Sequence, residues 1–316
     1  MTWDTVRNEP VASGATLRIY VRRPTGTPRA IVQVNHGLAE HGARYLRFAD
    51  FLAARGVATW AHDNRGHGHT TAPDAPLGTF ARRDGAATVV ADIGSVHDLI
   101  AAEHPGTPVI LFGHSGGGLA GLNFLARHSA RIVGAAIWNA NFSAGLLGRL
   151  AQAILAWERM RLGSDVPSRM LPRLTFQAWG RQVPHARTPF DWLSRDPVEV
   201  DKYIADPLCG WDASVSMWSD VFDLIFGGAD DRALAGIRRD LPINLVGGEK
   251  DPATDGGKAV DNLGGRLRRM GFSNLASTIY PKTRHESLND INRDAVMTDF
   301  ATWLDRVVPE PGQPSR

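Results

Sequence analysis

The sequence predicts an α/β fold, in which a mostly parallel central sheet is flanked by helices and a helical segment is inserted between two of its strands. Apolar strand-like runs alternate with amphipathic helical stretches up to residue 140, and the alternation returns after residue 237. The interval between them has helical spacing without a convincing strand. Such alternation is typical of parallel sheets that helices cover on both faces.

Each expected strand is a short apolar or alternating run bounded by turn residues: 15–23, 29–37, 57–63, 107–115, 131–140, 241–248 and 275–281. Apolar residues at helical spacing, with glycine or polar stops, predict the helices 44–56, 84–106, 118–128, 255–270 and 290–307. Asp84 stands where the N-cap residue of the second helix belongs.

The breaks in this rhythm suggest a domain division. Residues 1–140 and 237–309 form the predicted core, residues 141–236 form a helical cap (lid) insertion, and the Pro-rich tail 310–316 is expected to be disordered. The cap should lie over the carboxyl ends of the strands, where open α/β sheets bind ligands. Five of the nine tryptophans fall within the cap. They build either the cap's own small core or the wall of a pocket.

Composition excludes some classes of protein. The 35 basic and 33 acidic residues nearly cancel, and no Lys/Arg run concentrates the net charge of +2, so nucleic-acid binding is not expected. The single cysteine, Cys209, cannot form an internal disulfide. The start of the chain has no basic stretch followed by an apolar one, and no uninterrupted apolar run is long enough to span a bilayer. These features predict a cytoplasmic protein.

One short motif points to chemistry. Gly113-His114-Ser115-Gly116-Gly117 fits the G-x-S-x-G nucleophile elbow, in which a serine sits on a tight turn between a strand and a helix. Glycines are needed there because larger side chains would collide. The alternative is a glycine-rich connector with an incidental serine. The flanking strand and helix favour the nucleophile.

A serine hydroxyl needs a neighbouring base that a carboxylate orients. In this architecture the order along the chain is serine, acid, histidine. Asp251 follows a late strand and His285 follows the final one, so both should reach the sheet edge that carries Ser115. Three other carboxylates compete with Asp251 for the acid role: Glu249, Asp255 and Glu286.

The oxyanion of a tetrahedral intermediate requires backbone N–H groups already in place. Gly116, directly after the nucleophile, supplies one of them. The turn after an earlier strand supplies the second through Leu38, with His36 and Gly37 shaping that turn.

Several motifs resemble a known family. They are "HGLAEHGARY", "HDNRGHGHT", "GHSGGG", "DPLCG", "GGEKDP" and "RHESLND". Their order and context, from about residue 15 to 305, are similar to the monoacylglycerol lipase and bacterial lysophospholipase branch of the α/β-hydrolases. The resemblance implies the α/β-hydrolase fold, a lid over an acyl pocket, no metal or other cofactor, and hydrolysis of carboxylic esters with a single acyl chain. The expected partner is therefore a small lipid-like ester.

The resemblance also implies site roles. The nucleophile falls on Ser115, the acid on Asp251, the base on His285 and the oxyanion donors on Leu38 and Gly116. The sequence departs from the branch at Gly116, where methionine is usual. A backbone N–H survives any side chain, so this departure concerns substrate preference more than the type of reaction.

Rival interpretations remain open. An aminopeptidase shares this fold and triad, but no acidic cluster is evident to hold a substrate ammonium group. A non-catalytic ligand-binding protein could keep the fold, which the intact triad opposes. A metal site is not expected from the loosely spaced histidines His62, His67 and His69 with Asp63.

The first cap helix, expected at 146–163, is amphipathic. Its apolar face carries Leu146, Leu147, Leu150, Ile154 and Trp157. This face has three candidate roles: packing within its own domain, a mobile roof over an acyl pocket, or transient contact with a membrane or micelle surface. Packing is the most common role of such a face.

Overall fold

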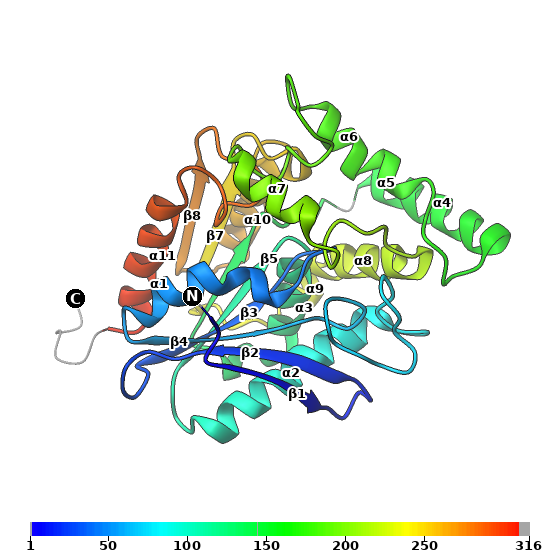
Figure 1. Cartoon of the computed structure of the whole chain (residues 1–316). Coiled ribbons are helices and arrows are strands. Elements are labelled where there is room, and N and C mark those ends of the chain that lie inside the picture. The colour runs from blue at the N-terminus through cyan, green and yellow to red at the C-terminus, as the bar shows by residue number, and fades with distance from the viewer. Residues whose placement is uncertain (1, 144, 310–316) are drawn as a thin grey trace.

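The computed structural model describes residues 2–143 and 145–309. Its centre is an eight-stranded sheet of order β1-β2-β4-β3-β5-β6-β7-β8, with helices on both faces (Figure 1). Strands β4, β3, β5, β6, β7 and β8 are parallel, while β1 and β2 are antiparallel to their neighbours. The predicted fold class is confirmed. The predicted tail 310–316 lies outside the described residues.

Seven strands lie where the sequence predicts them: β2 (Thr16–Arg22), β3 (Ala30–Asn35), β4 (Val57–His62), β5 (Val109–His114), β6 (Gly134–Trp138), β7 (Ile243–Gly248) and β8 (Leu275–Tyr280). An eighth, β1 (Thr5–Pro10), was not predicted. It pairs with β2 at the edge of the sheet, and none of its side chains is buried. Backbone hydrogen bonds to β2 hold this strand in place, so it does not need buried apolar side chains. Its sequence therefore lacks the apolar run by which strands are recognised.

Two hydrophobic clusters fill the space between sheet and helices. Successive strand residues point to opposite faces, so Ile31 joins one cluster and Val32 the other. Helices α2 (Gly85–Glu103), α3 (Gly116–His128) and α10 (Lys258–Arg269) cover the first face. The second face is covered by α1 (Leu46–Ala53), which follows a 3-10 turn at Gly42–Tyr45, and by α11 (Arg293–Val307).

Helix α2 reaches the length and mean hydropathy of a membrane-spanning segment, although Asp92 and Asp98 interrupt its apolar residues. Length and composition alone are weak evidence for a membrane span. Its residues Val89, Ile93, Val96 and Ile100 are buried in the first cluster. The apolar residues of α2 therefore pack against the sheet and neighbouring helices.

The inserted segment between β6 and β7 has six helices in its described residues: α4 (Leu146–Leu162), α5 (Leu171–Leu174), α6 (Phe176–Arg181), α7 (Pro197–Ala205), α8 (Val215–Gly228) and α9 (Asp231–Leu234). Helices α4, α5 and α6 extend away from the sheet in Figure 1. Helix α8 instead contributes Met217 and Leu224 to the first core cluster. The division into a core and a cap at residues 141–236 stays a prediction.

Asp84 occupies the predicted N-cap position of α2, but its side chain does not cap the helix. Asp84 has a left-handed φ of 52° and its side chain makes no capping bond. The first turn of α2 is capped from another helix, because the backbone N–H of Ala86 donates to Asp220 Oδ1 of α8 at 3.1 Å. A Cβ at Gly85 would lie 2.1 Å from Asp220 Oδ2. The carboxylate that caps α2 therefore comes from a residue far along the chain.

Candidate active site

Ser115 occupies a strained turn between β5 and α3. Its φ is 52° and its ψ is −118°, a conformation that non-glycine residues rarely adopt. The neighbouring glycines make this turn sterically possible. A Cβ at Gly113 would lie 2.4 Å from the Gly117 carbonyl oxygen, and one at Gly117 would lie 2.1 Å from the Asn35 carbonyl oxygen. The turn lifts the Ser115 side chain beyond the carboxyl end of β5.

The structure brings the three predicted residues into one hydrogen-bonded chain. Nε2 of His285 lies 2.9 Å from Ser115 Oγ. Nδ1 of His285 lies 3.0 Å from each carboxylate oxygen of Asp251. Because Asp251 follows β7 and His285 follows β8, parallel strands deliver all three side chains to one edge of the sheet.

Asp251 is fully buried and well supplied with donors. Thr254 Oγ1 and Asn139 Nδ2 donate to its Oδ2, and the Ala253 N–H donates to its Oδ1. Burial opposes the charged form, but His285 and these donors outweigh it and lower the pKa of Asp251. The carboxylate is therefore ionised at neutral pH and fixes the ring of His285.

The rival carboxylates have other partners. Glu286 forms a bidentate ion pair with Arg44. Asp255 is exposed and pairs with Lys258, while Glu249 accepts the Lys282 N–H. Asp251 is the one of the four that contacts the His285 ring.

The turn after β3 packs directly against the serine turn. A Cβ at Gly116 would lie 3.2 Å from Leu38 N, and one at Gly37 would lie 3.3 Å from Ser115 Cβ. His36 supports the turn, because its Nε2 accepts the Asn64 N–H at 2.9 Å and its Nδ1 contacts the Gly37 carbonyl at 2.7 Å. The Leu38 N–H has no hydrogen-bond acceptor among the described residues. It is thus free to bind an oxygen beside Ser115.

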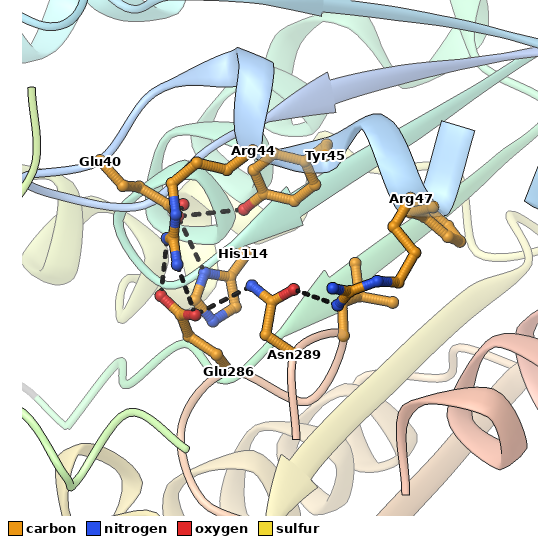
Figure 2. Close-up of a pocket in the computed structure, with 9 residues that line it drawn as sticks. Glu40, Arg44, Tyr45, Arg47, His114, Glu286 and Asn289 are labelled. Carbon is orange, nitrogen blue, oxygen red and sulfur yellow. Dashed lines mark hydrogen bonds and ion pairs between the residues drawn. The ribbon is translucent and has the colours of Figure 1, made fainter. Parts of the chain in front are cut away.

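A buried charge network lies behind the site (Figure 2). Arg44 donates to both oxygens of Glu286 and to Glu40 Oε2 at 2.7–2.8 Å. His114 lies between Glu40 Oε1 at 3.3 Å and the carbonyl oxygen of His285 at 3.0 Å. The network thus links the turn after β3 to the loop that carries His285.

A cavity of about 460 Å³ opens at Ser115 and His285. None of the described residues that line it is acidic. Its walls are mainly apolar and include Leu119, Leu147, Leu150, Ile154, Leu171, Phe176, Trp179, Trp218 and Phe222. Several cap aromatics therefore line a pocket, and Trp192 packs against the His285 ring at 4.9 Å between ring centroids. The cavity suits an extended apolar group next to the serine.

Helix α4 does not bury its apolar face as such helices usually do. Leu146 and Leu147 are more than four-fifths exposed, and Leu150 is 57% exposed. Yet Leu147, Leu150 and Ile154 also line the cavity. This helix is thus one wall of the pocket, and its apolar residues face the pocket and the solvent more than a packed core.

No metal cluster forms from His62, His67 and His69 in the described part of the chain. Burial lowers the pKa of His62 and His67 to about 4, so both rings are neutral. A different trio, His41, Asp206 and Cys209, has ligand atoms within 4.8 Å of one another. Asp206 already pairs with His41, and burial raises the pKa of the Cys209 thiol even though the nearby Arg44 cation acts to lower it. A metal ion therefore finds no ready thiolate there.

Sequence reasoning missed several residues around the site. Asn139, with a left-handed φ of 50°, follows β6 and bonds Asp251 and Ser287. Its position at the end of a strand on the same sheet edge is a signal that could have found it. Arg44 stands in the motif "HGLAEHGARY", four residues after its partner Glu40, but its second partner, Glu286, is distant in sequence. Tyr203 gave no such signal, since its partner Ala39 is distant in sequence.

A serine on such a turn, at the carboxyl edge of a parallel sheet with helices on both faces, defines the class of α/β-hydrolases, and the structure belongs to it. The model of the Hydrolase_4 family, described as serine aminopeptidase, S33, matches residues 26–292, and the chain belongs to this family.

Known proteins place the chain within the class. It is 26% identical over 297 residues to the monoacylglycerol lipase of Mycolicibacterium smegmatis, across 92% of this chain and 93% of that one. It is 29% identical over 197 residues to human monoglyceride lipase, across 62% and 58% of the two chains. A highly thermostable carboxyl esterase from Bacillus coagulans, in complex with glycerol, superposes with a TM-score of 0.87 at 21% identity, covering 98% of this chain and 99% of that one. The resemblance to the monoglyceride lipase-like branch is confirmed.

Proposed function

We propose that this protein is a serine hydrolase that cleaves carboxylic esters carrying a single acyl chain. Ser115 is the nucleophile, His285 the general base and Asp251 the carboxylate that orients it. One observation carries the proposal: the chain Asp251–His285–Ser115 ends at the mouth of an apolar cavity. The curated relatives that act on monoacylglycerols support the same class of substrate.

The reaction follows from the geometry. Ser115 Oγ attacks the ester carbonyl carbon while its proton passes to His285 Nε2, 2.9 Å away. The N–H groups of Leu38 and Gly116 receive the negative oxygen of the tetrahedral intermediate. Collapse of the intermediate expels the alcohol, which takes the proton from His285. Water then attacks the acyl-enzyme by the same steps and releases the carboxylic acid.

An aminopeptidase reaction is less well supported, although the family description names one. Binding a substrate ammonium group requires an unpaired carboxylate near the serine. Asp251 is bound to the His285 ring, and the other two carboxylates close to Ser115 and His285, Glu40 and Glu286, are ion-paired with Arg44, with His114 also against Glu40. The cavity at Ser115 therefore favours an uncharged, apolar acyl group.

The decisive experiment combines Ser115→Ala with a panel of p-nitrophenyl esters, monoacylglycerols, lysophospholipids and aminoacyl p-nitroanilides. We expect ester hydrolysis to fall by at least about 10³-fold and fluorophosphonate labelling to disappear. Ser95→Ala changes a serine of α2 outside the cavity lining and should keep full activity. Activity of Ser115→Ala within tenfold of the parent would refute the assignment, and cleavage of the anilides alone would favour the peptidase.

The outer face of α4 supports contact with a lipid surface. Leu146 and Met160 are 85% and 78% exposed, and Arg149, Arg159 and Arg161 belong to the same helix. Apolar and basic side chains together suit the boundary of an anionic bilayer. Sedimentation with vesicles should therefore retain the parent protein more strongly than Leu146→Gln/Met160→Gln.

A further inference from the structure

The turn that presents Leu38 is held in an unfavourable conformation by side chains from elsewhere. Ala39 has a left-handed φ of 55°, which costs a non-glycine residue conformational energy. On one side of the turn, Glu40 Oε1 accepts the Gly37 N–H at 2.6 Å and the Tyr45 hydroxyl at 3.0 Å. The first bond fixes the peptide between His36 and Gly37, which is the neighbour of the peptide that carries the Leu38 N–H.

The other side of the turn is held by the inserted segment. The carbonyl oxygen of Ala39 accepts the Tyr203 hydroxyl at 2.9 Å and the Gly210 N–H at 3.0 Å. Tyr203 belongs to α7 and Gly210 to the loop that follows it. A distant part of the chain therefore fixes the peptide that follows Ala39.

Tyr203 is itself rigidly placed. Its side chain is buried, with the Arg44 guanidinium 4.9 Å from the ring centroid and the Phe190 ring at 5.3 Å. Arg44, in turn, is bound to Glu40 and Glu286, as Figure 2 shows. The cluster of Arg44, Glu40 and Glu286, which also holds the His285 loop, thus helps to position the Tyr203 hydroxyl at Ala39.

We propose that Tyr203 is a positioning residue for ester hydrolysis: its hydroxyl fixes the Ala39 carbonyl and so keeps the Leu38 N–H aimed at the developing oxyanion. This inference rests on the proposed function. The Leu38 N–H contributes most when charge has developed on the substrate oxygen, so loss of its orientation should reduce kcat more than it raises KM.

The test is Tyr203→Phe, which removes only the hydroxyl. Losing an oxyanion donor outright costs about 10²–10³-fold in kcat, so loosening one should cost less, about tenfold. We expect this fall in kcat for p-nitrophenyl butyrate with little change in KM. The inhibition constant of hexyl trifluoromethyl ketone, whose adduct with Ser115 carries the oxyanion, should weaken by a similar factor. Incorporating 4-aminophenylalanine at 203 restores an N–H donor and should recover most of the activity.

The matched control is Tyr280→Phe. Tyr280 is also a buried tyrosine, and its hydroxyl bonds Asp299 of α11; its strand, β8, lies four strands away from β3 in the sheet. This variant should leave kcat and inhibitor affinity unchanged. The proposal is overturned if Tyr203→Phe keeps parental kinetics, or if kcat falls while ketone affinity stays constant. If Tyr203→Phe does not fold, 4-fluorophenylalanine fills the hydroxyl's space without a donor, and equal activity with 4-aminophenylalanine overturns the proposal. A parent enzyme without esterase activity would refute the proposed function instead.

Discussion

Helices α4 and α7 belong to the same inserted segment but are attached to the molecule in opposite ways. Apart from its pocket wall and the buried Leu155, α4 presents exposed apolar residues to solvent. The bonds of its buried carboxylate, Glu158, go to residues 168–170 among the described residues. Helix α7 is tied to the core by ion pairs from Arg47 to Glu199 and from Arg293 to Asp196, which is its N-cap. It also places Tyr203 on the turn of the oxyanion donor.

This difference shows that the segment inserted between β6 and β7 has two structural roles. The α4 half forms an apolar wall of the cavity, and none of its described side chains bonds Ser115, Asp251 or His285. The α7 half is part of the scaffold that holds those groups. Damage to α4 should therefore depend on the substrate, whereas damage around α7 should affect every substrate and the stability of the fold.

The largest effect is expected from Arg44→Met, which breaks the scaffold beneath α7. It leaves Glu40 and Glu286 buried without their cation, a change that typically costs 3–5 kcal/mol, so the free energy of unfolding should fall by about that amount. Urea denaturation measures it, and kcat should fall for esters of every chain length. Arg187→Met, which removes an exposed pair with Asp201, should cost less than about 1 kcal/mol. Equal stability of the two variants would contradict the scaffold role.

A smaller, substrate-dependent effect is expected from Leu150→Glu and Ile154→Glu in α4. Both side chains line the cavity, so a charge there should reduce kcat/KM for octanoate esters by about tenfold or more, since each buried methylene contributes roughly 0.8 kcal/mol. Acetate esters should change less than twofold. Leu146→Glu, on the same helix but outside the cavity lining, is the control. A uniform loss across chain lengths, with a lower melting temperature, would show that α4 is only structural.

The stability of the scaffold around Arg44, Glu40 and His114 should also depend on pH. Burial disfavours protonated His114, but its hydrogen bond and attraction to Glu40 prevail and raise the pKa of His114. A raised pKa stabilises the fold fully below the unfolded value of about 6.5, and this stabilisation is lost as pH rises through the folded value. The advantage of the parent over His114→Gln in urea denaturation should therefore shrink between pH 6 and pH 9. An advantage that grows with pH would mean that His114 is neutral in the fold.

We expect no effect from chelators, because the proposed reaction uses no metal ion in either half of the inserted segment. Ester hydrolysis should be unchanged after dialysis against EDTA. Loss of activity that zinc restores would instead direct attention to His41, Asp206 and Cys209.

Much of the site could be predicted because its signals are local. The glycines around Ser115 and the polar residues after two late strands are visible in the sequence, and parallel strands bring such positions to one edge. The same reasoning placed the start of α2 at Asp84 but could not show that the capping carboxylate comes from α8. It also missed β1, which is held by backbone pairing.

The sequence by itself therefore determined seven of the eight strands and the serine turn, because each depends on neighbours within a few positions. Asp251 and His285 are expected from their places after two late strands and from the family resemblance. Only the tertiary structure decided that α4 faces the cavity and solvent, and that Tyr203 bonds Ala39 across 164 residues of chain. Contacts of that kind depend on where two distant elements come to rest. Periodicity and turn signals describe each element alone, so they hold no information about that placement.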